Sequence, residues 1–310
     1  MSSVKIASVC MHAEMDKAAN LRRILEWMEE AARAGAALMV FPEQILSGYL
    51  YNCRCLYNEQ FVYQYANAEC VPEGPSVQKI VTRAMELGIY VIFGMTERDR
   101  REPDILYNTA VLTGPEGYIG KYRKVHLPMD ELHIYTPGTE FPVFETGIGR
   151  IGLMICYDKS FPEAARSMVL DGAQILVCPT AWGIRHPEKM DLEHDEARLL
   201  NDLYDQVRAT ENMVYYVSSN QVFQTKEAWY CGHSAIYSPA GERLAGTGFR
   251  EGICWADVDV EDGITKARYL AHNGNRPIRE RRPQAYRGLY RFMRKERTDE
   301  ENQDRCDWLR

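Results

Sequence analysis

The sequence Ile151-Gly152-Leu153-Met154-Ile155-Cys156-Tyr157-Asp158 places a cysteine at the end of an apolar run. The run predicts a buried strand over 150–156, and a helical pattern follows at 161–172. A thiol between a buried strand and a helix start meets backbone N–H groups and the helix dipole, which favour a thiolate. We therefore interpret Cys156 as a candidate nucleophile.

Two other reactive side chains have a similar placement. Glu43 follows the apolar run 37–41, and Lys124 closes the strand-like run 117–124. In open α/β sheets, ligands collect outside the carboxyl ends of the strands. Glu43, Lys124 and Cys156 are therefore predicted to converge on one pocket, although they lie far apart in the sequence.

Strand and helix patterns alternate along the chain and predict an α/β fold of mixed strand direction. Helices are expected at 17–33, 76–87 (with Ser76 as N-cap), 161–170 and 188–211, the last with Leu199 and Leu203 on its apolar face. Strands are expected at 4–12, 37–41, 89–97, 106–113, 117–124, 141–145, 150–156, 174–180, 213–220, 233–238 and 252–258. The turn 114–117 makes its two flanking strands a hairpin.

No Pro/Gly/Ser-rich linker divides the chain, so we expect one domain over 1–272. The segment 273–310 is rich in Arg and is predicted to be a C-terminal extension, either on the surface or as an arm to a partner subunit. Residues 44–74 form a long, Tyr-rich connection, and loops of that length usually serve function.

Composition narrows the classes of function. The 310 residues include 37 Lys and Arg against 44 Asp and Glu, and this net charge of -7 argues against a broad nucleic-acid-binding face. The chain contains no run of about 18 apolar residues, so no membrane span is expected. The N-terminus also lacks the layout of a signal peptide. Nine cysteines, an odd number, suggest thiols in a reducing compartment, so a cytoplasmic location is expected.

Two further patterns resemble known binding motifs but lack the spacing or the structural context that those motifs require. The glycines of 147–152 match a dinucleotide fingerprint, but they lead into a strand instead of opening a helix. Cys53 and Cys55, with Cys70, lack the spacing of a zinc site, so no metal is expected.

Three ordered strings resemble the signatures of the nitrilase (carbon–nitrogen hydrolase) superfamily. They are Phe41-Pro42-Glu43, Lys121-Tyr122-Arg123-Lys124-Val125-His126-Leu127-Pro128, and Gly152-Leu153-Met154-Ile155-Cys156-Tyr157-Asp158 with Phe161-Pro162-Glu163 after it. Supporting matches include Glu131 ahead of Tyr135-Thr136-Pro137-Gly138, and Arg208-Ala209 with Glu211-Asn212. The resemblance spans roughly residues 4–260, which is most of the chain.

The resemblance implies a four-layer αββα sandwich, with two mixed sheets inside and helices outside, and a homodimer or higher homo-oligomer. It implies Glu43 as general base, Lys124 as oxyanion partner and Cys156 as nucleophile, with Glu131 ordering the lysine. The backbone N–H of Tyr157 would complete the oxyanion hole. No metal or organic cofactor is implied.

The residues that follow the cysteine narrow the expected class of substrate. Nitrile-cleaving members usually carry Cys-Trp-Glu, whereas this chain has Cys156-Tyr157-Asp158, which favours amides or N-carbamoyl compounds. The expected reaction is hydrolysis of a small linear amide or N-carbamoyl compound through a cysteine thioester, with release of ammonia. Tyr49 and Trp182 are expected to contact the substrate.

Other functions remain open at the level of sequence. A nitrilase would form acid and ammonia from a nitrile, and a thioester-based acyltransferase would pass the acyl group to an amine. A noncatalytic binding protein is disfavoured because all three reactive residues are present. The charge of the substrate is undecided, since the expected pocket loops contain Arg54, Arg185 and His186 as well as Glu59, Glu188 and Asp191.

Overall fold

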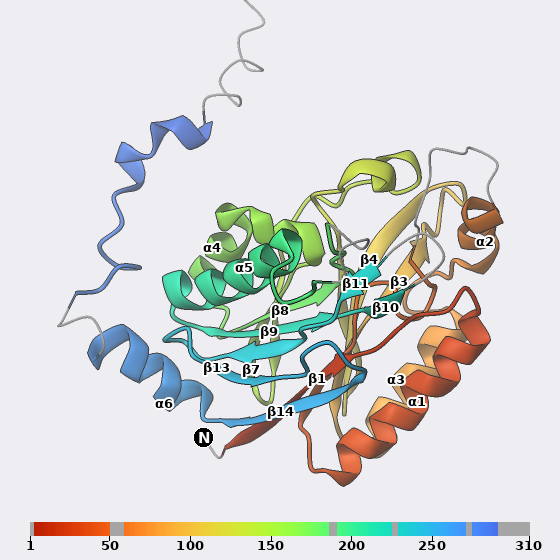
Figure 1. Ribbon diagram of the computed structural model, residues 1–310, viewed down its shortest axis with the longest axis horizontal. Coiled ribbons are helices and arrows are strands. Elements are labelled where there is room, and N and C mark those ends of the chain that lie inside the picture. The colour runs from red at the N-terminus through yellow and green to blue at the C-terminus, as the bar shows by residue number, and fades with distance from the viewer. Residues whose placement is uncertain (1–2, 50–58, 186–190, 225–228, 271–274, 291–310) are drawn as a thin grey trace, which may run out of the picture.

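Two six-stranded mixed sheets form the centre of the protein (Figure 1). The computed structural model describes residues 3–49, 59–185, 191–224, 229–270 and 275–290. The first sheet has the order β14 (Gly252–Val258), β1 (Val4–Cys10), β2 (Leu38–Val40), β3 (Tyr90–Arg98), β4 (Leu106–Gly114) and β5 (Gly117–Arg123). The second has the order β13 (Arg243–Gly246), β12 (Ala235–Tyr237), β9 (Tyr215–Asn220), β8 (Ile175–Thr180), β7 (Gly149–Leu153) and β6 (Val143–Thr146). A small hairpin joins β10 (Val222–Gln224) to β11 (Trp229–Cys231).

Helices cover the outer faces of both sheets. In Figure 1, α1 (Lys17–Arg33) and α3 (Pro75–Leu87) lie together against the first sheet, and α4 (Pro162–Leu170) and α5 (Glu196–Asn212) lie on the second. Short helices α2 (Glu59–Asn67) and α6 (Val260–Thr265) lie outside these layers. The protein is thus an αββα sandwich, which confirms the predicted fold class.

Side chains that alternate between the two faces of each strand explain how the sheets and helices form layers. In β2, Leu38 and Val40 belong to the apolar cluster that includes the second sheet, while Met39 packs with the α1 and α3 side. Successive strand side chains point to opposite faces, so a strand that is buried on both faces reads as a continuous apolar run. The apolar runs of the sequence therefore mark strands with a helix layer on one face and a sheet on the other.

The predicted elements are largely confirmed, including the β4–β5 hairpin and β6 as an edge strand. Three predictions were wrong. The connection 44–74 contains helix α2 within its described part. Helix α3 begins after Gly74, with Pro75 in its first turn, so Ser76 is not its N-cap. Helix α5 begins only after Asp195, whose side chain accepts from Ala197 and Arg198.

The apolar face expected for α5 was also wrong. Leu199 and Leu203 are exposed, whereas the buried face carries Arg198, Asn201, Asp205 and Arg208. Lys159 explains much of this inversion, because its Nζ donates to Asn201 and Asp205 and its backbone oxygen accepts from Arg208, and a buried polar group is stable when it is hydrogen-bonded. Within the described residues, no helix has the length and apolarity that crossing a membrane requires.

Candidate active site

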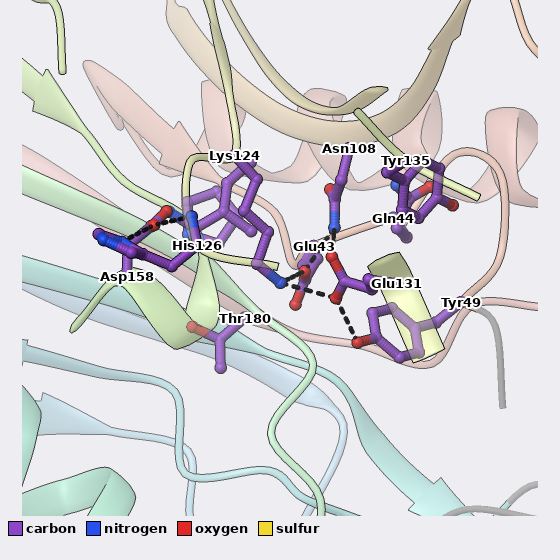
Figure 2. A network of polar contacts seen from close by, with 12 residues as sticks. Glu43, Gln44, Tyr49, Asn108, Lys124, His126, Glu131, Tyr135, Asp158 and Thr180 are labelled. Carbon is purple, nitrogen blue, oxygen red and sulfur yellow. Dashed lines mark hydrogen bonds and ion pairs between the residues drawn. The ribbon is translucent and has the colours of Figure 1, made fainter. Parts of the chain in front are cut away.

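Lys124 lies at the centre of a fully buried polar cluster (Figure 2). Its Nζ donates to Oε1 of Glu43 at 2.6 Å and to Oε1 of Glu131 at 2.7 Å. Asn108 Nδ2 donates to the same two carboxyl groups, at 2.7 Å to Glu43 and 3.1 Å to Glu131. The Tyr49 hydroxyl donates to Glu131 at 2.6 Å. The structure thus brings Glu43, Lys124 and Glu131 together as the sequence predicted.

The strand ends hold these side chains in place. Glu43 lies just beyond β2, where its backbone oxygen accepts a hydrogen bond of 2.9 Å from Gln221. A Cβ on Gly94 of β3 would lie 2.4 Å from the backbone nitrogen of Gln44, so only glycine permits this close approach. Lys124 lies just beyond β5, and its backbone nitrogen donates to Asn108 in β4.

Cys156 lies just beyond β7, at the first residue of the short 3-10 helix Cys156–Ser160. Its φ of 47° is in the left-handed region, which non-glycine residues seldom adopt outside sites that over-determine the backbone. Asp158 fixes the turn, since its Oδ2 accepts from the backbone nitrogen of Ile155 at 2.9 Å. Its Oδ1 accepts from the backbone nitrogen of His126 at 3.0 Å, which ties the cysteine turn to the segment after Lys124.

The electrostatics at Cys156 correct one expectation. Burial and the neighbouring charge of Glu43 raise the pKa of the thiol well above its usual value, against the opposing charges of Lys124 and Lys159 and a backbone hydrogen bond from Ala181. The resting sulfur is therefore a protonated thiol, and not the thiolate that the helix start suggested. A base must take its proton. Glu43 Oε2 is a buried oxygen for which the described residues supply no hydrogen-bond partner. This oxygen can therefore accept the proton of the thiol.

Lys124 keeps its charge in this setting. Burial alone would lower the pKa of Lys124, but the charges of Glu131 and Glu43 raise it well above its usual value. Burial raises the pKa of Glu131, although Lys124 opposes the shift. A fixed ammonium in a dry site is a strong stabiliser of a developing oxyanion.

The remaining predicted residues surround this cluster. Tyr49 contacts Glu131, and its ring packs against Tyr230 with the ring centres 6.1 Å apart. Trp182 lies next to Ala181, and its Nε1 donates to the backbone oxygen of Ala197 at 2.8 Å. Tyr157 has a half-exposed side chain.

Several residues weighed from the sequence have no described placement. Cys53, Arg54, Cys55, His186 and Glu188 lie outside the described residues. Within the described ranges, no group of three His, Cys, Asp or Glu side chains is arranged to hold a metal ion.

Sequence reasoning missed two residues of this region. Asn108 is a polar residue in an apolar strand, which was the available signal. Lys159 follows Tyr157-Asp158 in a stretch typical of an exposed helix start, yet it is fully buried. Its partners lie on α5, far away in the sequence, so nothing local indicated its burial.

Comparison with known proteins agrees with this geometry. The carbon–nitrogen hydrolase family model matches residues 5–268. A nitrilase of Pyrococcus abyssi is 33% identical over 260 residues, which cover 83% of this chain and 90% of that protein. The human omega-amidase NIT2 is 32% identical over 273 residues, covering 84% of this chain and 90% of that protein.

A solved structure shows the same fold. Saccharomyces cerevisiae Nit3, described as a member of branch 10 of the nitrilase superfamily, superimposes with a TM-score of 0.75 at 27% identity, covering 88% of this chain and 96% of that chain. The matched family model, the relatives and the fold agree on one family. The protein therefore belongs to the carbon–nitrogen hydrolase family of the nitrilase superfamily, and it is an enzyme that hydrolyses carbon–nitrogen bonds.

Proposed function

We propose that the protein hydrolyses a small linear carboxamide or N-carbamoyl compound, releasing ammonia through a thioester on Cys156. The observation that carries the proposal is the Lys124 ammonium held between Glu43 and Glu131, with its charge and that of Glu43 acting on the Cys156 thiol. This arrangement supports the proposal because acyl transfer from an amide requires a base, a cation and a nucleophile in one site.

The steps follow from this placement. Glu43 takes the proton from Sγ as the sulfur attacks the carbonyl carbon, and the Lys124 ammonium with the Tyr157 backbone N–H stabilises the negative oxygen. The carbon–nitrogen bond breaks, and the leaving nitrogen takes the proton from Glu43, so ammonia departs and a thioester remains. Glu43 then takes a proton from water, whose oxygen attacks the thioester. The acid leaves, and the proton returns to the thiolate.

Glu131 and Asn108 support the other members without joining the bond changes. Both contact groups of the proposed triad, Glu131 through Lys124 and Asn108 through Glu43. Tyr49 and Trp182 are proposed to line the acyl side of the site. Tyr157 is proposed to act through its backbone, because its side chain is half-exposed.

The test is an ammonia-release screen over carboxamides, ureido acids, carbamoyl amines and nitriles. Cys156→Ala should abolish turnover of every active substrate while circular dichroism stays native, because the proposed mechanism forms the thioester on this sulfur. Cys178→Ala, which changes a buried cysteine of β8, serves as the matched control and should retain turnover. Full activity in Cys156→Ala would refute the proposed mechanism.

A nitrilase is the second candidate, because the Pyrococcus abyssi relative bears that name. The Tyr157-Asp158 sequence after the cysteine favours amide substrates over nitriles. Acid formed faster from a nitrile than from the matching amide would reverse this preference.

A further inference from the structure

A second lysine lies buried beside the nucleophile. Lys159 belongs to the same short helix as Cys156 and is fully buried. Its Nζ donates to Asn201 Oδ1 at 2.6 Å and to Asp205 Oδ1 at 2.8 Å, both on α5. The proposed reaction steps leave this ammonium without a role.

The position of Lys159 connects it to the reacting sulfur. Its Nζ lies 4.9 Å from the centre of the Trp182 ring, and the neighbouring Ala181 makes a backbone hydrogen bond to Cys156. The charge of Lys159 lowers the pKa of the Cys156 thiol, after the larger effects of burial, Glu43 and Lys124, and the charge of Asp205 raises the pKa of Lys159. Lys159 and Cys156 are therefore linked through their shared short helix and through the Ala181–Trp182 segment.

We propose that Lys159, fixed by Asn201 and Asp205, is a positioning residue that stabilises the negative sulfur of Cys156 while the thiol proton resides on Glu43. This inference rests on the proposed function. When the proton moves, negative charge passes from the Glu43 carboxylate to Sγ, and an ammonium already fixed in a dry interior stabilises it without reorganisation. Lys159 forms and breaks no covalent bond and keeps its protons.

Stability alone gives no reason for this pair. A buried ion pair contributes little compared with well-packed apolar side chains of similar volume, because both charges lose their hydration. An ammonium at this position is better explained by the charge that develops next to it.

The charged groups around the sulfur fix the expected direction of change. Glu43 raises the pKa of the Cys156 thiol, and Lys124 and Lys159 lower it. The groups that act on Lys159 are Asp205, Cys178 and Cys156, and Asp205 in turn is influenced by Asp202. Removing the Lys159–Asp205 pair takes away a cation near the sulfur, so the thiol should ionise at higher pH.

The experiment measures how fast iodoacetamide alkylates Cys156 as a function of pH, by mass spectrometry of the peptide that contains it. The double variant Lys159→Met/Asp205→Asn removes both charges and leaves neither partner alone. Its alkylation should be about tenfold slower at neutral pH, with a midpoint about one pH unit higher, because one pKa unit is a tenfold change in thiolate. Superimposable profiles of variant and wild type overturn the inference.

A matched control separates charge from stability. Lys17→Met/Glu69→Gln removes another ion pair, 2.7 Å long and with a buried carboxylate, whose members lie in α1 and just before α3, whereas Cys156 follows β7 of the second sheet. In this control variant, the pH midpoint of Cys156 alkylation should stay at its wild-type value even though the fold becomes less stable. A midpoint shift as large as that of the Lys159 variant would show that general destabilisation causes the change, and would overturn the inference.

A second variant covers the case in which the double variant fails to fold by circular dichroism. Asn201→Asp keeps the Lys159–Asp205 pair and adds a carboxylate at the ammonium, which weakens its field at the sulfur. Alkylation of Cys156 should again slow at neutral pH, and an unchanged profile overturns the inference.

The wild-type protein distinguishes this inference from the proposed function. If it releases no ammonia from any substrate of the screen and Cys156 reacts no faster than Cys178, both fail. If it is active while the profiles of the variants are unchanged, only the role of Lys159 fails.

Discussion

Asn108 shows how one amide organises two acids. Its Nδ2 donates to Glu43 and to Glu131, which also share the Lys124 ammonium. Two carboxylates this close repel each other unless donors lie between them. The arrangement holds Glu43 at a fixed position, so the geometry of the proposed base depends on Asn108, a residue to which the proposed mechanism gives no part in the bond changes.

Asn108→Ala should lower kcat for ammonia release by about 10- to 100-fold. Losing a hydrogen bond to a charged group costs about 1.5–3 kcal/mol, and each 1.36 kcal/mol is about tenfold in rate. Steady-state kinetics on the most active amide measures the change. Asn67→Ala, whose Nδ2 only donates to the backbone of Tyr63, is the control and should stay near wild type. Equal kcat in both variants would count against this role.

Lys124→Met should cost about 3–5 kcal/mol of unfolding free energy near neutral pH, because it leaves buried carboxylates without their cation. Burial already raises the pKa of Glu131, and loss of Lys124 raises it further above the unfolded value. A raised carboxyl pKa penalises the fold above that pKa, and protonation relieves the penalty as the pH falls. Urea unfolding at about pH 5 should therefore show a smaller loss than at about pH 8. An equal loss at both values would contradict this electrostatic account.

At the scale of elements, the start of α3 is held by a side chain from outside the helix. Glu69 accepts from the backbone nitrogen of Ser76 at 2.8 Å, from its hydroxyl at 2.7 Å and from Lys17 at 2.7 Å. An anion at a helix N-terminus satisfies free N–H groups and matches the helix dipole. This external carboxylate replaces the capping role that the sequence suggested for Ser76.

Glu69→Gln should destabilise the protein by about 1–3 kcal/mol at neutral pH. Burial alone would raise the pKa of Glu69, but the hydrogen bonds from Lys17 and Ser76 outweigh it and lower the pKa. A lowered carboxyl pKa stabilises the fold above the unfolded value, and this contribution is lost as the pH falls below about 4. Urea unfolding across this range should show the difference from wild type shrinking in acid.

The control for this prediction lies on the same helix. Glu86 of α3 pairs with Arg83 at the surface, and exposed pairs contribute little. Glu86→Gln should change the unfolding free energy by less than about 0.5 kcal/mol at every pH. A loss as large as that of Glu69→Gln would show that charge in general, and not the cap, is responsible.

At the scale of the whole molecule, the dimer and the division at residue 272 stay predictions. The described part of the C-terminal extension, 275–290, runs along the α4 side of the sandwich in Figure 1, where Arg281 and Tyr286 line a cavity with Pro162 and Arg166. The α5 leucines at 199, 200 and 203 are exposed in the single chain. An arm and an uncovered apolar strip are compatible with a partner subunit.

Sedimentation should give a mass about twice the 35.7 kDa of one chain. Truncation after residue 272 should leave the sandwich folded by circular dichroism, because the described part of the extension, 275–290, contributes no strand to it. If the extension is a dimer arm, the truncated chain should dissociate at higher concentration than the full chain. A single-chain mass for the full protein at micromolar concentration would refute the dimer.

Local patterns in the sequence predicted an α/β fold and the strand ends that precede Glu43, Lys124 and Cys156, whereas the family resemblance implied the αββα sandwich and the roles of these residues. Strands buried on two faces need continuous apolar runs, and Glu43 and Cys156 each follow such a run within a few residues, whereas Lys124 follows the half-buried edge strand β5. The strand that carries each residue could therefore be identified without coordinates.

Only the tertiary structure decided which polar side chains are buried and what charge the sulfur carries at rest. Lys159 and Asp205 lie 46 residues apart in the sequence and meet inside the protein, so no local pattern distinguishes them from solvated residues. The helix start at Cys156 suggested a thiolate, but burial and Glu43 raise the pKa of the thiol. Burial is a property of what packs around a residue, and desolvation outweighs the local dipole.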